Sequence, residues 1–181
     1  MVLIGVLALQ GDFAEHKAKL ASLGAQTIEI RQLKDLEKPL DGLVLPGGES
    51  TVQGKLLADL GLLESLRERI QQGLPVLATC AGLILLAENV ENQAKRYLGT
   101  LPVTVKRNAY GRQLGSFATA LDFADLGQVP ATFIRAPYIS EVEDEVEILS
   151  KHQGKIVAAR YRNQIGLSFH PEVDENDSIH S

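Results

Sequence analysis

The sequence predicts a three-layer α/β domain with a mixed, mostly parallel central sheet and added antiparallel strands. Through roughly the first ninety residues, short apolar runs alternate with segments of helical periodicity, which is typical of βαβ units and a parallel sheet. After Asn89 the chain changes to strand-like runs separated by turn residues. The 181 residues are 45% hydrophobic, enough to bury one core, and we expect a single domain over residues 1–181.

The first half of the chain supplies the expected parallel strands and their helices. Val2–Leu9 is continuously apolar, as a strand buried on both faces should be. A helix is expected over Phe13–Leu23, with Asp12 as candidate N-cap and Gly24 at its end. The further expected elements are a strand at 27–30, a helical turn at 33–36, a strand at 42–45, a helix capped by Ser50 or Thr51, a helix at 62–72 and a strand at 76–79.

The second half supplies strands with tighter connections. Residues 108–112 and 153–154 are typical of hairpin turns. We therefore expect antiparallel strands beside the parallel sheet, with a return strand ending at Phe169. The strand-like runs are 100–107, 113–120, 132–134, 146–150, 155–161 and 164–169.

Composition and charge exclude several classes of function. The formal charge of 18 − 23 = −5, with no basic stripe, argues against a nucleic-acid partner. The apolar N-terminal run lacks a basic leader and is too short to span a membrane. A single cysteine excludes an internal disulfide and suits the cytoplasm. No ligand cluster with metal spacing, dinucleotide fingerprint or P-loop is present, so no metal or organic cofactor is expected.

The only cysteine, Cys80, lies between an apolar strand-like run and an apolar helical run. This arrangement is typical of a nucleophile elbow, where Gly82 allows the strand and the helix to approach closely. Backbone N–H groups at a helix start favour a thiolate and can stabilise an oxyanion. The alternative is a buried core cysteine, and a base elsewhere in the chain is needed to decide.

A candidate base lies near the C-terminus, in Ser168-Phe169-His170-Pro171-Glu172. On an extended segment the side chains of His170 and Glu172 point to the same side, so the carboxylate can orient the imidazole. The alternative is an ordinary surface turn before a proline. No other histidine has such a companion: His16 is placed on a helix, His152 in a hairpin turn and His180 in the tail.

A third motif, Leu45-Pro46-Gly47-Gly48-Glu49-Ser50-Thr51, lies at the carboxyl end of the third expected strand. Ligands of open α/β sheets bind at this carboxyl edge, where the elbow also opens. The two glycines allow a backbone N–H to point at a reacting carbonyl, and Glu49 can hold a cationic group. The alternative is an ordinary turn with an acidic helix start.

Together these segments resemble the class I, triad-type glutamine amidotransferases. Within that class the chain is most similar to the PdxT/SNO family, the glutaminase subunits of pyridoxal 5′-phosphate synthase. The resemblance covers nearly the whole chain. The segments that match are 5–11, 45–51, 79–86, 107–108 with 111–113, 133–137 and 169–172, and those at 47–51, 107–113 and 133–137 point to this family in particular.

The resemblance implies a flavodoxin-like fold and hydrolysis of L-glutamine to L-glutamate and ammonia through a γ-glutamyl thioester. It makes Cys80 the nucleophile, His170 the general base and Glu172 its orienting partner. The implied glutamine-binding residues are Gly48, Glu49, Ser50, Arg107, Ile134 and Arg135, and the implied oxyanion donors are Gly48 and Ala81. An arginine fork suits the α-carboxylate of glutamine, and a carboxylate suits its α-ammonium.

The implied partner is a PdxS/SNZ-type synthase subunit in a hetero-oligomer. Alternative functions are the glutaminase subunit of another amidotransferase, such as imidazole glycerol phosphate synthase, a γ-glutamyl hydrolase, or a non-catalytic binding module on the same fold. The sequence departs from the family at Ala78, where glycine is usual in the elbow, and at its end at Ser181, where the family continues into a closing helix.

Overall fold

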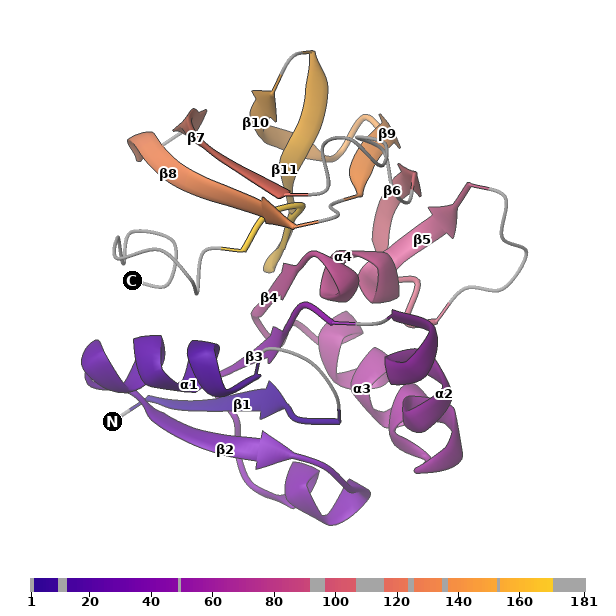
Figure 1. The fold of residues 1–181 in the computed structure, drawn as a ribbon. Coiled ribbons are helices and arrows are strands. Elements are labelled where there is room, and N and C mark those ends of the chain that lie inside the picture. The colour runs from indigo at the N-terminus through magenta and orange to yellow at the C-terminus, as the bar shows by residue number, and fades with distance from the viewer. Residues whose placement is uncertain are drawn as a thin grey trace.

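A computed structural model describes residues 2–9, 13–48, 50–91, 97–106, 116–123, 126–134, 137–152 and 154–170, and Figure 1 shows their arrangement. The helices are α1 (Phe13–Ser22), the 3₁₀ helix η1 (Leu33–Glu37), α2 (Ser50–Asp59), α3 (Leu62–Gln71) and α4 (Ala81–Leu86). The strands are β1 (Leu3–Leu7), β2 (Gln26–Ile30), β3 (Gly42–Leu45), β4 (Val76–Thr79), β5 (Ala87–Val90), β6 (Leu101–Lys106), β7 (Ser116–Phe123), β8 (Gly127–Ile134), β9 (Tyr138–Val142), β10 (Glu147–His152), β11 (Lys155–Tyr161) and β12 (Gln164–Leu167).

The main sheet is mixed, with its parallel part at one end. Its strand order is β2-β1-β3-β4-β12-β11-β9-β6-β5, and β10 pairs with β11 at the side. The run from β2 to β12 is parallel, and β11 and β9 are antiparallel to their neighbours. The expected fold class is confirmed, with the parallel strands placing their carboxyl ends along one edge.

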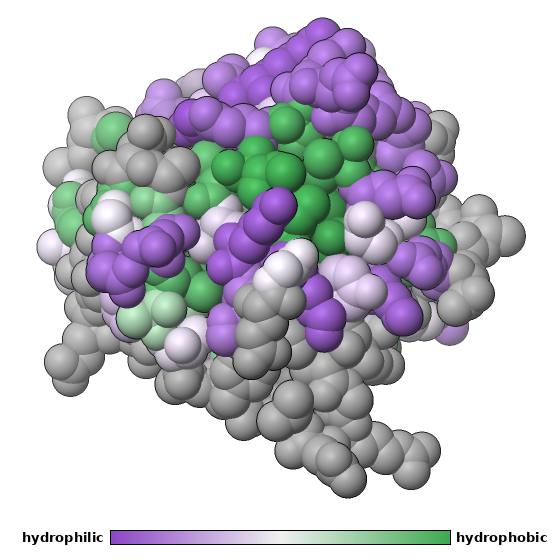
Figure 2. Space-filling view, turned by 90° about the horizontal axis from the view of Figure 1, so that it is seen from above, coloured by the Kyte–Doolittle hydropathy of each residue, from purple (hydrophilic) through white to green (hydrophobic). Residues whose placement is uncertain are grey.

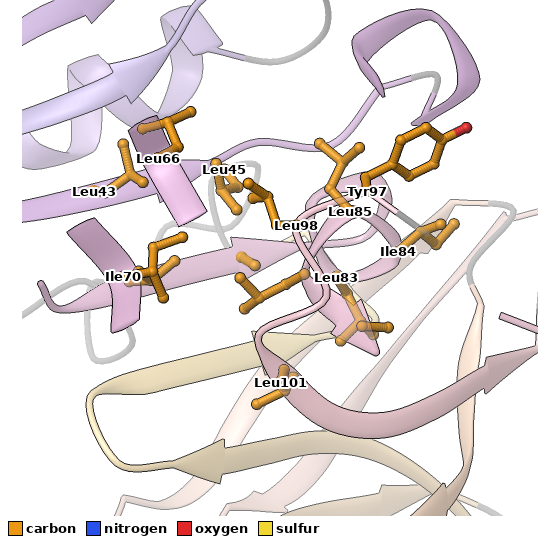
Figure 3. Close-up of a cluster of buried hydrophobic side chains, with 14 of the residues drawn as sticks. Leu43, Leu45, Leu66, Ile70, Leu83, Ile84, Leu85, Tyr97, Leu98 and Leu101 are labelled. Atoms are coloured by element: carbon orange, nitrogen blue, oxygen red, sulfur yellow. The ribbon is translucent and has the colours of Figure 1, made fainter. Parts of the chain in front are cut away.

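Side chains alternate between two covered faces of the parallel strands. Leu43 and Leu45 of β3 join the largest core cluster, beneath α2, α3 and α4, whereas Val44 joins a cluster with Leu20 of α1. Figure 3 shows the larger cluster, in which leucines of β3, α3 and α4 meet. The domain therefore has three layers, because helices cover both faces of the sheet.

The second half of the chain differs from expectation in four places. β5 and β9 were not expected, and β7 pairs only with β8, as a separate two-stranded sheet. That small sheet packs its apolar residues, Phe133 among them, against Leu167 and Phe169 beside the main sheet. The hairpin expected at 108–112 lies outside the described residues, and His152 ends a strand instead of lying in the turn. The missed strands are short and lack the alternation that marks half-buried strands.

The surface seen from above in Figure 1 carries apolar residues at its centre with hydrophilic residues around them (Figure 2). This face belongs to the second half of the chain, where the β7–β8 and β10–β11 hairpins lie. Two exposed apolar side chains, Leu126 and Ile148, belong to these hairpins. Among the described residues no helix is long and apolar enough to cross a membrane.

Candidate active site

Cys80 occupies a sharp turn between β4 and α4. Its backbone has φ 49° and ψ −104°, a conformation that side-chain-bearing residues rarely adopt. Such strain persists where the surrounding structure fixes it, and it is typical of a nucleophile elbow. The side chain is 7% exposed. The elbow predicted at this cysteine is therefore present in the backbone.

Two glycines allow α4 to lie against the strands beside the elbow. A Cβ on Gly82 would overlap the carbonyl group of Leu45 in β3, at 2.8 Å from its carbonyl carbon. A Cβ on Gly166 of β12 would lie 2.6 Å from Cδ1 of Leu83. The close approach expected at Gly82 is thus a backbone contact with β3, the strand that leads into Pro46-Gly47-Gly48.

α4 ends at Leu86, where the apolar run of the sequence also ends, and the chain continues directly into β5. A helix of six residues has only a partial macrodipole at its start. The start of so short a helix therefore gives Cys80 only weak electrostatic support.

His170 follows β12, the strand next to the one that leads into Cys80. β12 is parallel to β4, with Leu167 opposite Thr79, so Cys80 and His170 follow neighbouring strands at the same edge. His170 is 3% exposed, and Phe169 before it is buried in the core beneath the small sheet. The imidazole is thus held at the carboxyl edge and is not part of an exposed turn.

The Pro46-Gly47-Gly48 turn follows β3, on the other side of β4. Gly48 has φ 152°, and the side-chain amide of Gln53 donates a hydrogen bond to the carbonyl of Pro46 at 3.3 Å. Ser50 is the buried first residue of α2 and Thr51 is the second, so both lie inside the helix and neither is its cap. α2 therefore holds the turn in place at Pro46, just before the two glycines.

One polar contact beside Cys80 was not expected from the sequence. Nε2 of His16, on α1, lies 3.2 Å from Oγ1 of Thr79, and both side chains are fully buried. The indication available in the sequence was the spacing of His16 and Leu20, which places a histidine on the apolar face of α1.

Five expected site residues are not described in full. Glu49, Arg107, Arg135 and Glu172 lie outside the described residues, and for Ile134, at the end of β8, only the backbone is described. The described residues bring together Cys80, Ala81, His170, Gly48 and Ser50 at one edge of the sheet. Among these parts of the chain no group of three or more His, Cys, Asp or Glu is placed to hold a metal ion.

One carboxylate near α1 has a shifted pKa. Partial burial raises the pKa of Glu29, but the hydrogen bond and charge of Lys17 and the charge of Arg31 outweigh this and hold the pKa below its ordinary value. Nζ of Lys17 lies 3.3 Å from Oε1 of Glu29, which ties α1 to β2.

The fold places a strained cysteine at the carboxyl edge of a mixed α/β sheet and a buried histidine after the neighbouring strand, the arrangement expected of a glutamine amidotransferase domain. The SNO glutamine amidotransferase family model matches residues 6–180. The chain belongs to this family.

Individual relatives agree with the family assignment. The chain is 62% identical to pyridoxal 5′-phosphate synthase subunit PdxT of Desulfitobacterium hafniense over 177 residues, which is 98% of this chain and 89% of that protein. It is 56% identical to the PdxT subunit of Methanocorpusculum labreanum, over 98% of this chain and 93% of that one. A crystal structure of a glutamine amidotransferase superposes with a TM-score of 0.93 at 41% identity, covering 98% of this chain and 94% of the other.

Proposed function

We propose that this chain is the glutaminase subunit of a pyridoxal 5′-phosphate synthase, in which it hydrolyses L-glutamine and delivers ammonia to a synthase subunit. The observation that supports this most is the strained backbone of Cys80 on β4 beside the strand that leads to His170. Its relatives named PdxT support the choice of synthase, because their identity with this chain extends over nearly its whole length.

In the first step Sγ of Cys80 attacks the side-chain amide carbon of glutamine, and His170 accepts the thiol proton. The tetrahedral intermediate collapses with breakage of the C–N bond. His170 returns the proton to the leaving group, so that ammonia departs and a γ-glutamyl thioester remains. His170 then removes a proton from water, which attacks the thioester and releases glutamate and the thiol. Glu172 orients the imidazole throughout. No step requires a metal or an organic cofactor.

The negative oxygen of the tetrahedral intermediate is stabilised by the backbone N–H groups of Gly48 and Ala81 in this proposal. Ala81 follows the nucleophile directly, and Gly48 follows the neighbouring strand β3, so both donors come from the edge where Cys80 lies.

Glutamine itself is held by residues from several segments. Arg107 binds the α-carboxylate in our proposal, and Glu49 binds the α-ammonium, each through charge-assisted hydrogen bonds. The remaining contacts come from Gly48, Ser50, Ile134 and Arg135.

A synthase subunit docked at this edge controls the reaction by selecting one orientation of the Gly47-Gly48 peptide. Glycine changes φ and ψ at little cost, and one orientation points an N–H at the oxyanion. The bond from Gln53 to Pro46 fixes the chain just before this peptide, which leaves the two glycines as the pivot. Residues 10–12, which follow β1 in the sequence, are a contact for the synthase in this proposal, and the complex works in the cytoplasm.

The test is steady-state release of glutamate by this chain alone and with a saturating PdxS-type synthase subunit. We expect the chain alone to be slower by about 10²–10³, the usual effect of one missing oxyanion donor. Stimulation by an imidazole glycerol phosphate synthase partner instead would contradict the assignment of the synthase. Full activity of the isolated chain would contradict control by the partner and leave the chemistry of Cys80 unaffected.

A further inference from the structure

The bond between His16 and Thr79 joins α1 to the residue immediately before the nucleophile. Both side chains are fully buried, and Nε2 of His16 lies 3.2 Å from Oγ1 of Thr79. We infer that His16 is a positioning residue, which holds Thr79 and, through it, the backbone of Cys80 in the conformation required for attack. This inference rests on the proposed function, in which Cys80 is the nucleophile.

The need for such a residue follows from the backbone of Cys80. A φ of 49° with a ψ of −104° is unfavourable for any residue with a side chain, so neighbouring contacts must hold it. On one side, the amide of Cys80 donates a hydrogen bond to the carbonyl of Leu167 in β12. On another, Gly82 lies against Leu45 of β3. His16 adds a contact from the helix layer, on the residue where β4 ends.

Thr79 can transmit this contact because its side chain points to the α1 side of the sheet and has few rotamers. Leu77 packs in the cluster of Val6, Leu20 and Val44 on the α1 side of the sheet. Thr79, two residues later on the same strand, points to the same side. A threonine branches at Cβ and has few χ1 choices, so fixing its hydroxyl also fixes its Cβ and the adjoining peptide. The peptide on its carboxyl side is the one that enters Cys80.

The bond between His16 and Thr79 is buried at a position where packing alone does not require a polar side chain. His16 lies on the face of α1 that also buries Leu20, and Leu20 packs with Val6 of β1 and Val44 of β3. An apolar side chain at 16 would suit that environment as well and would avoid the desolvation of an imidazole. A hydrogen bond between a buried histidine and a buried hydroxyl fixes the relative orientation of the two side chains, which apolar packing alone does not.

The experiment compares variants that remove the bond with variants that keep it. Thr79→Val keeps the branched shape and removes the hydroxyl, and His16→Phe fills the space without a hydrogen-bonding atom. Thr79→Ser and His16→Gln keep a polar group at each position. Two quantities are measured: kcat and KM for glutamine in the complex with the synthase subunit, and the rate of alkylation of the chain alone by iodoacetamide, which reports Cys80 because it is the only thiol.

We expect Thr79→Val and His16→Phe each to lower kcat by about tenfold, the size of effect that a small displacement of a reacting group produces. The KM for glutamine should stay within about twofold, since the positions that bind glutamine are not touched. Alkylation should slow in parallel. The double variant should be no slower than either single one, whereas Thr79→Ser and His16→Gln should keep most of the rate.

Leu20→Ala is the matched control, because it loosens the same face of α1 one turn further along without a polar contact to β4. It should lower the melting temperature and leave kcat and alkylation unchanged. Wild-type kcat and alkylation in Thr79→Val, or an equal loss of kcat in Leu20→Ala, would overturn the inference. Glutamate release by Cys80→Ala would instead overturn the proposed function, and the alkylation rates would still decide whether His16 orients this thiol.

Discussion

The amide nitrogen of Cys80 lies 2.8 Å from the carbonyl oxygen of Leu167. This hydrogen bond extends the parallel ladder of β4 and β12 one residue beyond its last pair, Thr79 and Leu167. The backbone of the elbow is therefore attached to the strand that reaches His170 three residues later. The main-chain hydrogen bonds of the sheet thus fix the backbone positions from which the side chains of Cys80 and His170 extend.

Replacing Cys80 tests the chemistry most directly. Cys80→Ala should abolish glutamate release while leaving the fold and glutamine binding largely intact, because it removes the nucleophile and little volume. His170→Asn should be nearly as damaging, and the double variant little worse, since residues that act as a unit do not contribute additively. Activity is measured in the complex, and binding by calorimetry with glutamine. Substantial turnover by Cys80→Ala would exclude the thioester mechanism.

Gly48→Ala tests the glycine pivot. Gly48 has φ 152°, at the edge of the region that an L-residue rarely adopts, so a side chain there restricts rotation of the peptide. We expect this variant to remain slow, by about 10²–10³ in kcat, even with a saturating synthase subunit. Normal stimulation of Gly48→Ala by the synthase would show that the peptide does not need to turn.

Substitution by alanine should have different effects at Gly82 and at Gly166, the two glycines beside α4. Gly82→Ala places a methyl against the backbone carbonyl of Leu45, which cannot move alone, whereas Gly166→Ala meets the end of the Leu83 side chain. We expect Gly82→Ala to lower the free energy of unfolding by about 1–3 kcal/mol or more and to reduce kcat, because the elbow must shift. Gly166→Ala should be milder in both respects. Urea unfolding and glutaminase assays compare them, and equal effects would contradict this reading of the packing.

Gly54 of α2 provides a second packing test, away from the nucleophile. A Cβ there would lie 2.6 Å from Cζ of Tyr97, whose carbonyl and that of Leu98 are held by Arg67. Gly54→Ala should therefore destabilise the protein by about 1–3 kcal/mol, although alanine is the better helix former. In a Tyr97→Ala background the same change should be neutral or stabilising by up to about 1 kcal/mol. A double-mutant cycle measures the coupling, and additive effects would contradict the predicted overlap.

The contact of Glu29 with Lys17 and Arg31 predicts a dependence of stability on pH. The pKa of Glu29 is lower in the folded protein than in the unfolded chain, so its contribution to stability is present at neutral pH and is lost as the pH falls from the ordinary pKa of a glutamate through the lower folded pKa. Because these charges are partly exposed, the contribution should be below about 1 kcal/mol. Glu29→Gln should remove this part of the acid loss in urea titrations at several pH values. An unchanged acid profile in Glu29→Gln would exclude the contribution.

The parallel half of the fold was predicted well from the sequence, because the patterns that indicate its strands and its helix ends are local. Val76–Thr79 is a short apolar run between a glycine and a small-residue turn, and the strand occupies those residues. Gly24 and Gly73 have the positive φ values expected where helices end. The elbow at Cys80 and the return strand before His170 were also predicted from local patterns.

The remaining features depend on contacts between distant segments, which a local pattern does not contain. β5 forms where α4 ends after only six residues, because Ala87 and Val90 pair with β6. β9 is fixed by its pairing with β6 and β11. The bond from His16 to Thr79 joins residues 63 positions apart, so neither residue indicates its partner in the sequence.

The position of β12 within the main sheet has a consequence for synthesis and folding. β12 is the last described strand along the chain, yet it lies between β4 and β11. During translation the first strands and helices can assemble early, but β4 remains an unpaired sheet edge until residues up to Leu167 have been made. Pairing over this sequence distance is slow compared with local folding. We therefore expect nascent chains to be inert toward glutamine, so that ammonia is produced only by molecules whose folding is complete.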